Sequence, residues 1–181
     1  MRKLSMSELD RLTVSEFIHS EKIPIAVVLD NVRSALNIGS IFRTADAFRV
    51  QEIILVGISA QPPHRDILKS ALGATETVVW RYFETQSKAI QYIQSQNYVI
   101  VPVEQTDCSI KLSSFNCSDK NSMALIFGNE VNGVSDDFLN VAEHSLEVEQ
   151  MGMKHSLNVS VCAGIVLHHI RLQLNSSYLE G

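Results

Sequence analysis

Apolar runs that alternate with helically spaced segments constrain the fold of this chain more than any other feature. Residues 23–31 and 52–57 are dominated by branched apolar side chains. Between them, residues 38–48 place apolar side chains three and four positions apart, as one face of a helix does. Nearly continuous apolar runs are typical of strands buried on both faces, as in parallel sheets. The pattern therefore predicts an α/β fold, with a mainly parallel sheet covered by helices on both faces.

Turn residues, helix caps and apolar spacing predict the elements in the rest of the chain. Two prolines make residues 59–66 a loop. Ser7, Asn37 and Ser135 are each predicted to cap the helix that follows them. Further strands are predicted at 77–83, 98–104, 123–130 and 144–150, and helices at 5–20, 85–96, 136–142 and 157–174. We expect an N-terminal helical extension over 1–22 and one domain over 23–181.

Composition excludes several classes of protein. A hydrophobic content of 45% with 19% charged residues is typical of a folded globular chain rather than a disordered one. No apolar run is long enough for a membrane span and the N-terminus lacks a signal-peptide core, so we expect a cytoplasmic protein. Cys108, Cys117 and Cys162 form no close pair, which fits reduced thiols. Metal-ligand spacing is absent from the sequence, so no metal is expected.

The charge distribution leaves two interpretations open. A net charge of −5 argues against nucleic-acid binding in general. Residues 1–90, however, carry 11 Lys and Arg against 10 Asp and Glu, whereas residues 91–181 carry 4 against 10. A local basic surface in the first half and an ordinary solvated mixed surface both fit this asymmetry. The first-half basic residues include Arg33, Arg43, Arg49, Arg65 and Lys69.

Three polar segments follow or precede predicted elements at places where ligands of parallel sheets bind. In the first, Asn37 can cap a helix, Gly39 allows close backbone approach, and Arg43 lies one turn further on. These side chains could converge on a phosphate or sugar, and a capped helix with a surface arginine fits equally well. In the second, Glu130 directly follows a buried strand, where a carboxylate is costly unless it is paired, for example with an arginine. A glutamate that only caps a helix or occupies a turn is the alternative.

The third segment, residues 152–164, opens the last predicted helix with small and polar residues. Ser156 and Asn158 lie two positions apart, so they do not share a helix face and are predicted to serve different targets. Capping of the helix by Ser156 is the simpler alternative. The glycine fingerprints of dinucleotide-binding and P-loop proteins are absent, which disfavours a nucleotide-linked oxidoreductase.

Taken together, N-x-G-x-x-x-R at 37–43, G-N-E-x-x-G at 128–133 and S-L-N-V-S-V at 156–161 resemble the three motifs of the TrmH (SpoU) branch of the SPOUT RNA methyltransferases. The resemblance covers roughly residues 23–174 and implies a Rossmann-like sheet whose C-terminal part forms a deep trefoil knot. It implies methyl transfer from S-adenosylmethionine to a ribose 2′-hydroxyl of tRNA or rRNA. Because the chain is short and shows no added RNA-binding domain, we expect tRNA rather than rRNA. The resemblance also implies a homodimer, in which one subunit holds the cofactor and the other supplies the arginine.

Residue roles follow from the same resemblance. Arg43 would be the catalytic arginine, Asn37 would position it or the RNA backbone, and Glu130 would orient Arg43 or the substrate. Ser156 and Asn158 would shape the site around cofactor and ribose. The cofactor would contact Val103, Glu104, Gln105, Gly128, Asn129, Val148, Gly152, Met153, Ser156 and Leu157. Apart from the resemblance, the basic side chains of Arg33, His64, Arg65, Lys69 and Lys154 are candidates for contacts with RNA phosphates, and simple solvation is the alternative.

The sequence departs from the family pattern at residues 148–150 and leaves open both the path of the proton and the presence of turnover. Val148-Glu149-Gln150 stands where the family usually has Ile-Pro-Met, which puts the shape of one pocket wall in doubt. The proton of the ribose hydroxyl could pass to a neutralised Arg43 or to a substrate phosphate, and we favour positioning and alkoxide stabilisation as the main role of Arg43. A methyltransferase-like RNA-binding protein without turnover is the alternative to an enzyme.

Overall fold

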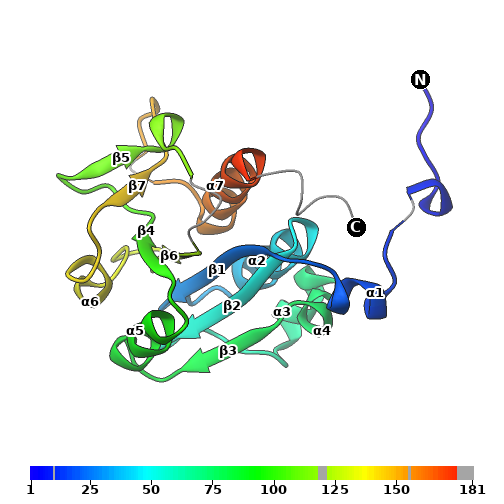
Figure 1. Cartoon of the computed structure of the whole chain (residues 1–181), viewed down its shortest axis with the longest axis horizontal. Coiled ribbons are helices and arrows are strands. Elements are labelled where there is room, and N and C mark those ends of the chain that lie inside the picture. The colour runs from blue at the N-terminus through cyan, green and yellow to red at the C-terminus, as the bar shows by residue number, and fades with distance from the viewer. Residues whose placement is uncertain (10, 118–121, 155, 175–181) are drawn as a thin grey trace.

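The centre of the molecule is a sheet of five parallel strands in the order β3-β2-β1-β6-β4 (Figure 1). It is seen in a computed structural model, which describes residues 1–9, 11–117, 122–154 and 156–174. The arrangement confirms the predicted α/β class. The strands are β1 (Ile23–Asp30), β2 (Val50–Val56), β3 (Trp80–Phe83), β4 (Val99–Pro102) and β6 (Met123–Phe127).

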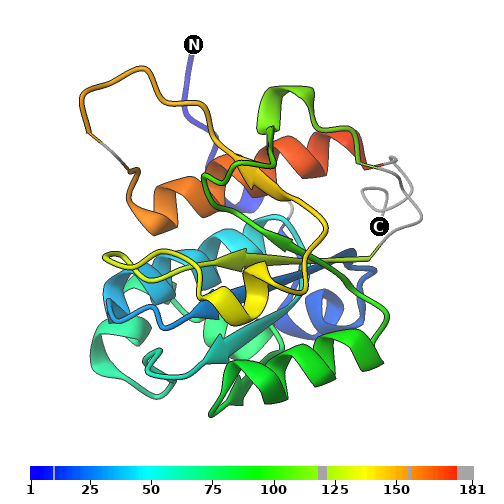
Figure 2. The ribbon, with the colours of Figure 1, turned by 90° about the vertical axis from the view of Figure 1, so that its left-hand side faces the viewer.

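Helices cover both faces of this sheet because both faces are apolar. Ile25, Val27 and Leu29 of β1 belong to the larger core cluster, whereas Ala26 and Val28 belong to a second cluster on the opposite face. Figure 2 shows α7 and α5 on opposite sides of the sheet. The larger cluster is covered by α2 (Ala35–Ala47), α3 (Arg65–Ala71), α4 (Ala74–Thr77) and α7 (Val159–Gln173), and the smaller by α5 (Gln86–Ser95) and α6 (Asp136–Leu139).

A small second sheet lies beside the carboxyl end of β4. Its two parallel strands are β5 (Ser109–Lys111) and β7 (Ser145–Glu147), and η2 (Leu112–Ser114) follows β5. A bridge between Val103 and Leu146 connects it to the residue after β4. The strand predicted over 144–150 is thus present as β7 but is shorter than predicted. The strand β5 was not predicted, because its residues are largely exposed and form no apolar run.

The N-terminal segment differs from the single helix predicted over 5–20. It forms a short turn, η1 (Met6–Leu9), and a separate helix, α1 (Val14–His19). The cap of α1 is Thr13, whose hydroxyl accepts from the N–H of Glu16 while the Glu16 carboxylate accepts from the N–H of Thr13. This reciprocal capping box starts the helix well after Ser7, so the prediction of Ser7 as its cap was wrong.

Other helix starts also differ from their predictions. Ser34 caps α2 by accepting from the N–H of Asn37, and Asn158 caps α7 by accepting from the N–H of Ser160. Asn37 and Ser156 are therefore not caps. Ser135 does precede α6, but its side chain makes no capping bond. The helix α3, which was not predicted, begins inside the loop predicted over 59–66. The helix α4, also not predicted, ends at the first residue of the strand predicted over 77–83.

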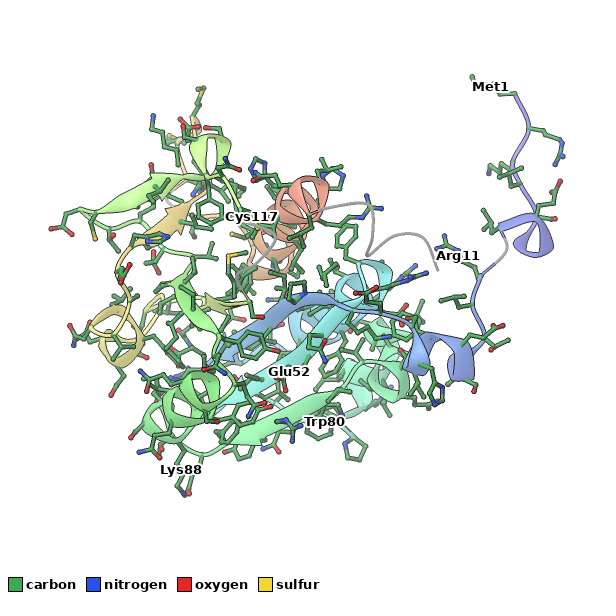
Figure 3. The ribbon with its side chains drawn as sticks, viewed as in Figure 1. Met1, Arg11, Glu52, Trp80, Lys88 and Cys117 are labelled. Carbon is green, nitrogen blue, oxygen red and sulfur yellow. The ribbon has the colours of Figure 1, made fainter. Side chains whose placement is uncertain are left out.

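A buried carboxylate on β2 belongs to the scaffold. Glu52 is buried and accepts hydrogen bonds from Arg81 Nε at 3.0 Å and from the Tyr92 hydroxyl at 3.0 Å. Figure 3 labels Glu52 near the middle of the sheet. Because its partners already satisfy this charge, Glu52 is a structural residue rather than a ligand site.

None of the described helices has the length and apolar character needed to span a bilayer.

Gly39 permits the close contact between α2 and α3, as the sequence suggested. A Cβ at this position would lie 2.4 Å from the Ile67 carbonyl oxygen and 2.1 Å from Ser70 Oγ. Since the carbonyl belongs to a helix backbone, Gly39→Ala is expected to lower the free energy of unfolding by about 1–3 kcal/mol. Urea denaturation followed by circular dichroism measures this. Gly152→Ala, where a Cβ meets nothing within 4 Å, is the control and should change stability by less than about 0.5 kcal/mol.

Candidate active site

A cavity of about 560 Å³ opens at the carboxyl ends of β4 and β6. Its walls come from the segment after β4, the turn after β6, the residues around β7 and the start of α7. The predicted cofactor contacts Gly152 and Met153 do not line it but are exposed in the segment before α7. The structure does bring to this cavity Val103, Glu104, Gln105, Gly128, Asn129, Val148, Ser156 and Leu157.

The turn after β6 explains the spacing of G-N-E-x-x-G. A Cβ on Gly128 would lie 2.1 Å from the carbonyl carbon of Gly133, so the two ends of the turn touch through backbone alone. Asn129 and Gly133 exchange both backbone hydrogen bonds at 2.9 Å. The side-chain oxygen of Asn129 accepts from the N–H groups of Val131 and Asn132. Gly133 has a φ of 70°, which favours glycine, so both glycines of the motif are needed for this turn.

Glu130 projects from this turn toward the start of α2. Its carboxylate accepts hydrogen bonds from Asn37 Nδ2 at 3.2 Å and from the backbone N–H groups of Arg33 and Ser34 at 3.3 Å. Burial opposes ionisation, but these hydrogen bonds and one from its own backbone outweigh it and hold the pKa of Glu130 below its ordinary value. The sequence suggested an arginine as partner. In the described part of the chain, an amide and backbone donors take that place.

Asn37 connects Glu130 to the last motif. While its Nδ2 donates to Glu130, its Oδ1 accepts from Asn158 Nδ2 at 3.2 Å. Asn158 in turn uses its own oxygen to cap α7. The chain Glu130–Asn37–Asn158 therefore joins residues that are 93 and 121 positions apart. Because Glu130 and Asn158 both line the cavity, this network forms one of its edges.

Arg43 lies elsewhere in the protomer. It is exposed on α2, about 9 Å further along the helix axis than Asn37 by the rise of an α-helix. There it lines a different cavity of about 540 Å³, together with Arg11 and Asp46. Figure 3 labels Arg11 on the side of the molecule near α1, away from α6. Within this chain, Arg43 thus does not line the cavity that contains Glu130 and Asn158.

The predicted RNA contacts lie in three places. His64, Arg65 and Lys69 are exposed at α3, where the His64 ring accepts from the N–H of Asp66, and α3 packs against α2. Arg33 is exposed just before α2, beside Glu130. Lys154 is exposed in the separate segment that precedes α7.

Cys162, Glu147 and Gln150 also line the cavity and were not predicted as ligand contacts. Burial, together with the negative charge of Glu104, raises the pKa of the Cys162 thiol to about 11. Its position four residues after Asn158 on a helix was the signal that both share a face. Within the described residues, no group of His, Cys, Asp and Glu is placed to hold a metal ion.

The fold and this cavity together define an α/β protein with a cavity at the carboxyl ends of its parallel strands, where ligands of such sheets bind. Residues 24–168 match the SpoU rRNA Methylase family, and the chain belongs to that family. It is 28% identical over 150 residues to the 23S rRNA (guanosine-2′-O-)-methyltransferase RlmB of Neisseria meningitidis, covering 83% of this chain and 59% of the relative. It is 25% identical over 167 residues to the tRNA (guanosine(18)-2′-O)-methyltransferase of Thermus thermophilus, covering 92% and 84%.

Solved structures share this fold. The AdoMet-bound rRNA methyltransferase from Sinorhizobium meliloti superposes with a TM-score of 0.78 and 26% identity, over 92% of this chain and 62% of that one. The TrmH/SpoU tRNA modifying enzyme of A. aeolicus superposes with a TM-score of 0.76 and 24% identity, over 88% and 80%. The chain therefore spans about three fifths of some relatives and most of others.

Proposed function

We propose that this protein transfers a methyl group from S-adenosylmethionine to the 2′-hydroxyl of a ribose in RNA, with tRNA as the preferred substrate. The Glu130–Asn37–Asn158 network carries this proposal, because it joins all three sequence motifs at the edge of one cavity. Relatives named for ribose 2′-O-methylation of tRNA and of rRNA support the reaction. A cytoplasmic location is proposed with it, since a tRNA or rRNA substrate would be met there.

The residues of the cavity fit the cofactor. A volume of about 560 Å³ lies within the range of small-molecule sites. Val103, Val148 and Leu157 supply apolar surface, while the carboxylate of Glu104 is suited to a cationic ligand. The cofactor supplies a methyl group already activated by its attachment to a sulfonium. The protein therefore needs mainly to bind, align and exclude water.

The residues of the edge have separate tasks in this proposal. Glu130 is anionic but occupied by several N–H donors, so it holds Asn37 and the start of α2 in place rather than removing a proton. Asn37 and Asn158 orient the ribose. Arg43 stays protonated and stabilises the negative charge that develops on the attacking oxygen.

A homodimer completes this site in our proposal. Arg43 does not line the cavity of its own protomer, so a second copy would have to supply it. The exposed apolar residues Val161, Ile165 and Leu172 of α7 are a suitable dimer surface. We also propose a deep trefoil knot in the C-terminal part, and an N-terminal extension over 1–22 distinct from the catalytic domain over 23–181.

The dimer surface can be tested at Ile165, which is 40% exposed on α7. Ile165→Glu is expected to shift the protein from dimer to monomer, because two carboxylates would have to be buried in the symmetric interface. Sedimentation velocity measures the change. Val141→Glu, at a 44% exposed residue after α6, is the control and should remain dimeric. A monomeric wild-type protein would contradict the proposal.

The reaction is tested with labelled cofactor and RNA transcripts. Purified protein should place label on tRNA, and nuclease digestion should release a 2′-O-methylnucleoside. After the position is mapped, the matched control is the same tRNA with a single 2′-deoxy substitution at that nucleotide, which should take up no label. Label on a base, or on the deoxy substrate, would refute ribose methylation. Preference for rRNA transcripts would refute only the choice of RNA.

A further inference from the structure

The cavity is strongly acidic. Its described lining residues include three carboxylates, from Glu104, Glu130 and Glu147, and no Lys, Arg or His. Glu130 faces the start of α2, and Glu147 accepts a hydrogen bond from Ser109 Oγ at 2.9 Å. Glu104 belongs neither to the turn after β6 nor to the Glu130–Asn37–Asn158 network, and suiting a cationic ligand is all that the proposed function asks of it. A half-enclosed site with this charge attracts cations.

Glu104 is held in place by backbone groups. Its Oε1 accepts from the N–H of Gln105 and its Oε2 from the N–H of Val134, both at 3.0 Å. A Cβ on Gly133 would lie 2.3 Å from Oε2, so the second glycine of the turn also leaves room for this carboxylate. Each oxygen has accepting capacity beyond one N–H, so a further donor or cation in the cavity can still be bound.

The charge of Glu104 reaches the other side of the cavity. Cys162 lies on α7, and after burial the charge of Glu104 is the second cause of its raised pKa. A carboxylate that disfavours a thiolate there favours a positive charge in the same space. The position of the Glu104 carboxylate and its effect on the Cys162 thiol therefore both indicate that the cavity favours a positive charge.

We infer that Glu104 is a specificity-determining residue, which makes the cavity select the positively charged sulfonium cofactor over its neutral thioether product. The inference rests on the proposed function. Methyl transfer lowers the charge of the cofactor by one unit. The sulfur keeps the electron pair of the broken S–C bond, the methyl group joins the ribose oxygen, and the proton of that hydroxyl is released to water. The attraction to Glu104 is therefore lost in the product, which favours its exchange for fresh cofactor.

Calorimetric titration with S-adenosylmethionine and with S-adenosylhomocysteine tests this inference. Glu104→Gln is expected to weaken binding of the sulfonium compound about tenfold and of the thioether less than about twofold. Glu143→Gln makes the same charge change at an exposed residue that does not line the cavity, and it should alter neither affinity. Equal weakening of both ligands by Glu104→Gln would overturn the inference and leave Glu104 a structural residue.

A second variant is needed in case Glu104→Gln disturbs the fold, because the glutamine side chain has one acceptor oxygen where the carboxylate has two for the N–H groups of Gln105 and Val134. Gln105→Lys adds a positive charge at an exposed residue of the cavity without removing the backbone N–H that holds Glu104. It should also weaken sulfonium binding more than thioether binding, and an equal effect would contradict the inference. If the wild-type protein binds neither ligand, the proposed function itself fails, and this inference with it.

Discussion

Replacing Arg43 with alanine is expected to lower the rate of methyl transfer about 100- to 1,000-fold while leaving cofactor affinity unchanged. The loss has the size seen when one group that stabilises developing negative charge is removed from an active site. Cofactor affinity should not change, because Arg43 lines a cavity separate from the one proposed for the cofactor in its own protomer. Single-turnover kinetics and calorimetry measure the two quantities. Arg43→Lys should recover little activity, because an ammonium lacks the planar fork.

Mixed dimers decide whether Arg43 acts across the interface. Asn158→Ser should also be nearly inactive, but it keeps a side-chain oxygen to cap α7. In a heterodimer of Arg43→Ala and Asn158→Ser, one cavity keeps Asn158 and receives Arg43 from the other subunit. Random pairing of equal amounts should therefore restore about one quarter of wild-type activity. A mixture that stays inactive after subunit exchange would show that Arg43 acts within its own protomer.

The buried strands were predictable because their pattern depends on short-range features. Every residue of β1 except Pro24 is buried, with alternate side chains in the two core clusters, so both faces had to be apolar. By contrast, β5 is three residues long and largely exposed, so it has no apolar run from which a strand could be predicted. Its pairing with β7 is stabilised by tertiary context that local sequence does not encode.

Helix caps and site residues show the same limit. Asn37 and Ser34 are both good capping residues, and Ser34 caps α2 because the Asn37 side chain bridges Glu130 and Asn158 instead. Sequence spacing identified the residues capable of polar contacts, but not which contacts win across about a hundred positions. Spacing along the chain did not show that Arg43 lies away from the cavity. Only the family resemblance predicted that a second subunit supplies this arginine, because no pattern within one chain specifies a contact with another.

Asn37→Asp is expected to reduce activity about 100-fold at neutral pH, although the side chain keeps its shape. The amide that donates to Glu130 at 3.2 Å would become a second carboxylate facing the first. Two carboxylates at this distance cannot both stay ionised without large cost, so the network should open and release Asn158 as well. Steady-state kinetics measure the loss. Asn140→Asp, at the C-cap of α6, is the control with the same chemical change and should keep normal activity.

The pH dependence of this variant gives the cause. In the wild-type protein, hydrogen bonds hold the pKa of Glu130 below its ordinary value, so the network is intact at neutral pH. In Asn37→Asp, repulsion raises the pKa of the pair, and one proton shared between the carboxylates restores a donor. Relative to wild type, activity should therefore rise as the pH falls. A constant ratio at all pH values would mean that the loss has another cause.

A compensating substitution separates electrostatics from shape. Asn37→Asp combined with Glu130→Gln exchanges donor and acceptor, since the new amide can donate to the new carboxylate. Because the amide oxygen can still accept from Arg33 or Ser34, the double variant should recover at least about tenfold of the lost activity. Its pH dependence should return toward that of the wild-type protein. If instead the double variant loses as much activity as the losses of Asn37→Asp and Glu130→Gln alone multiplied together, the two residues act independently. The hydrogen bond between them would then not be needed for activity.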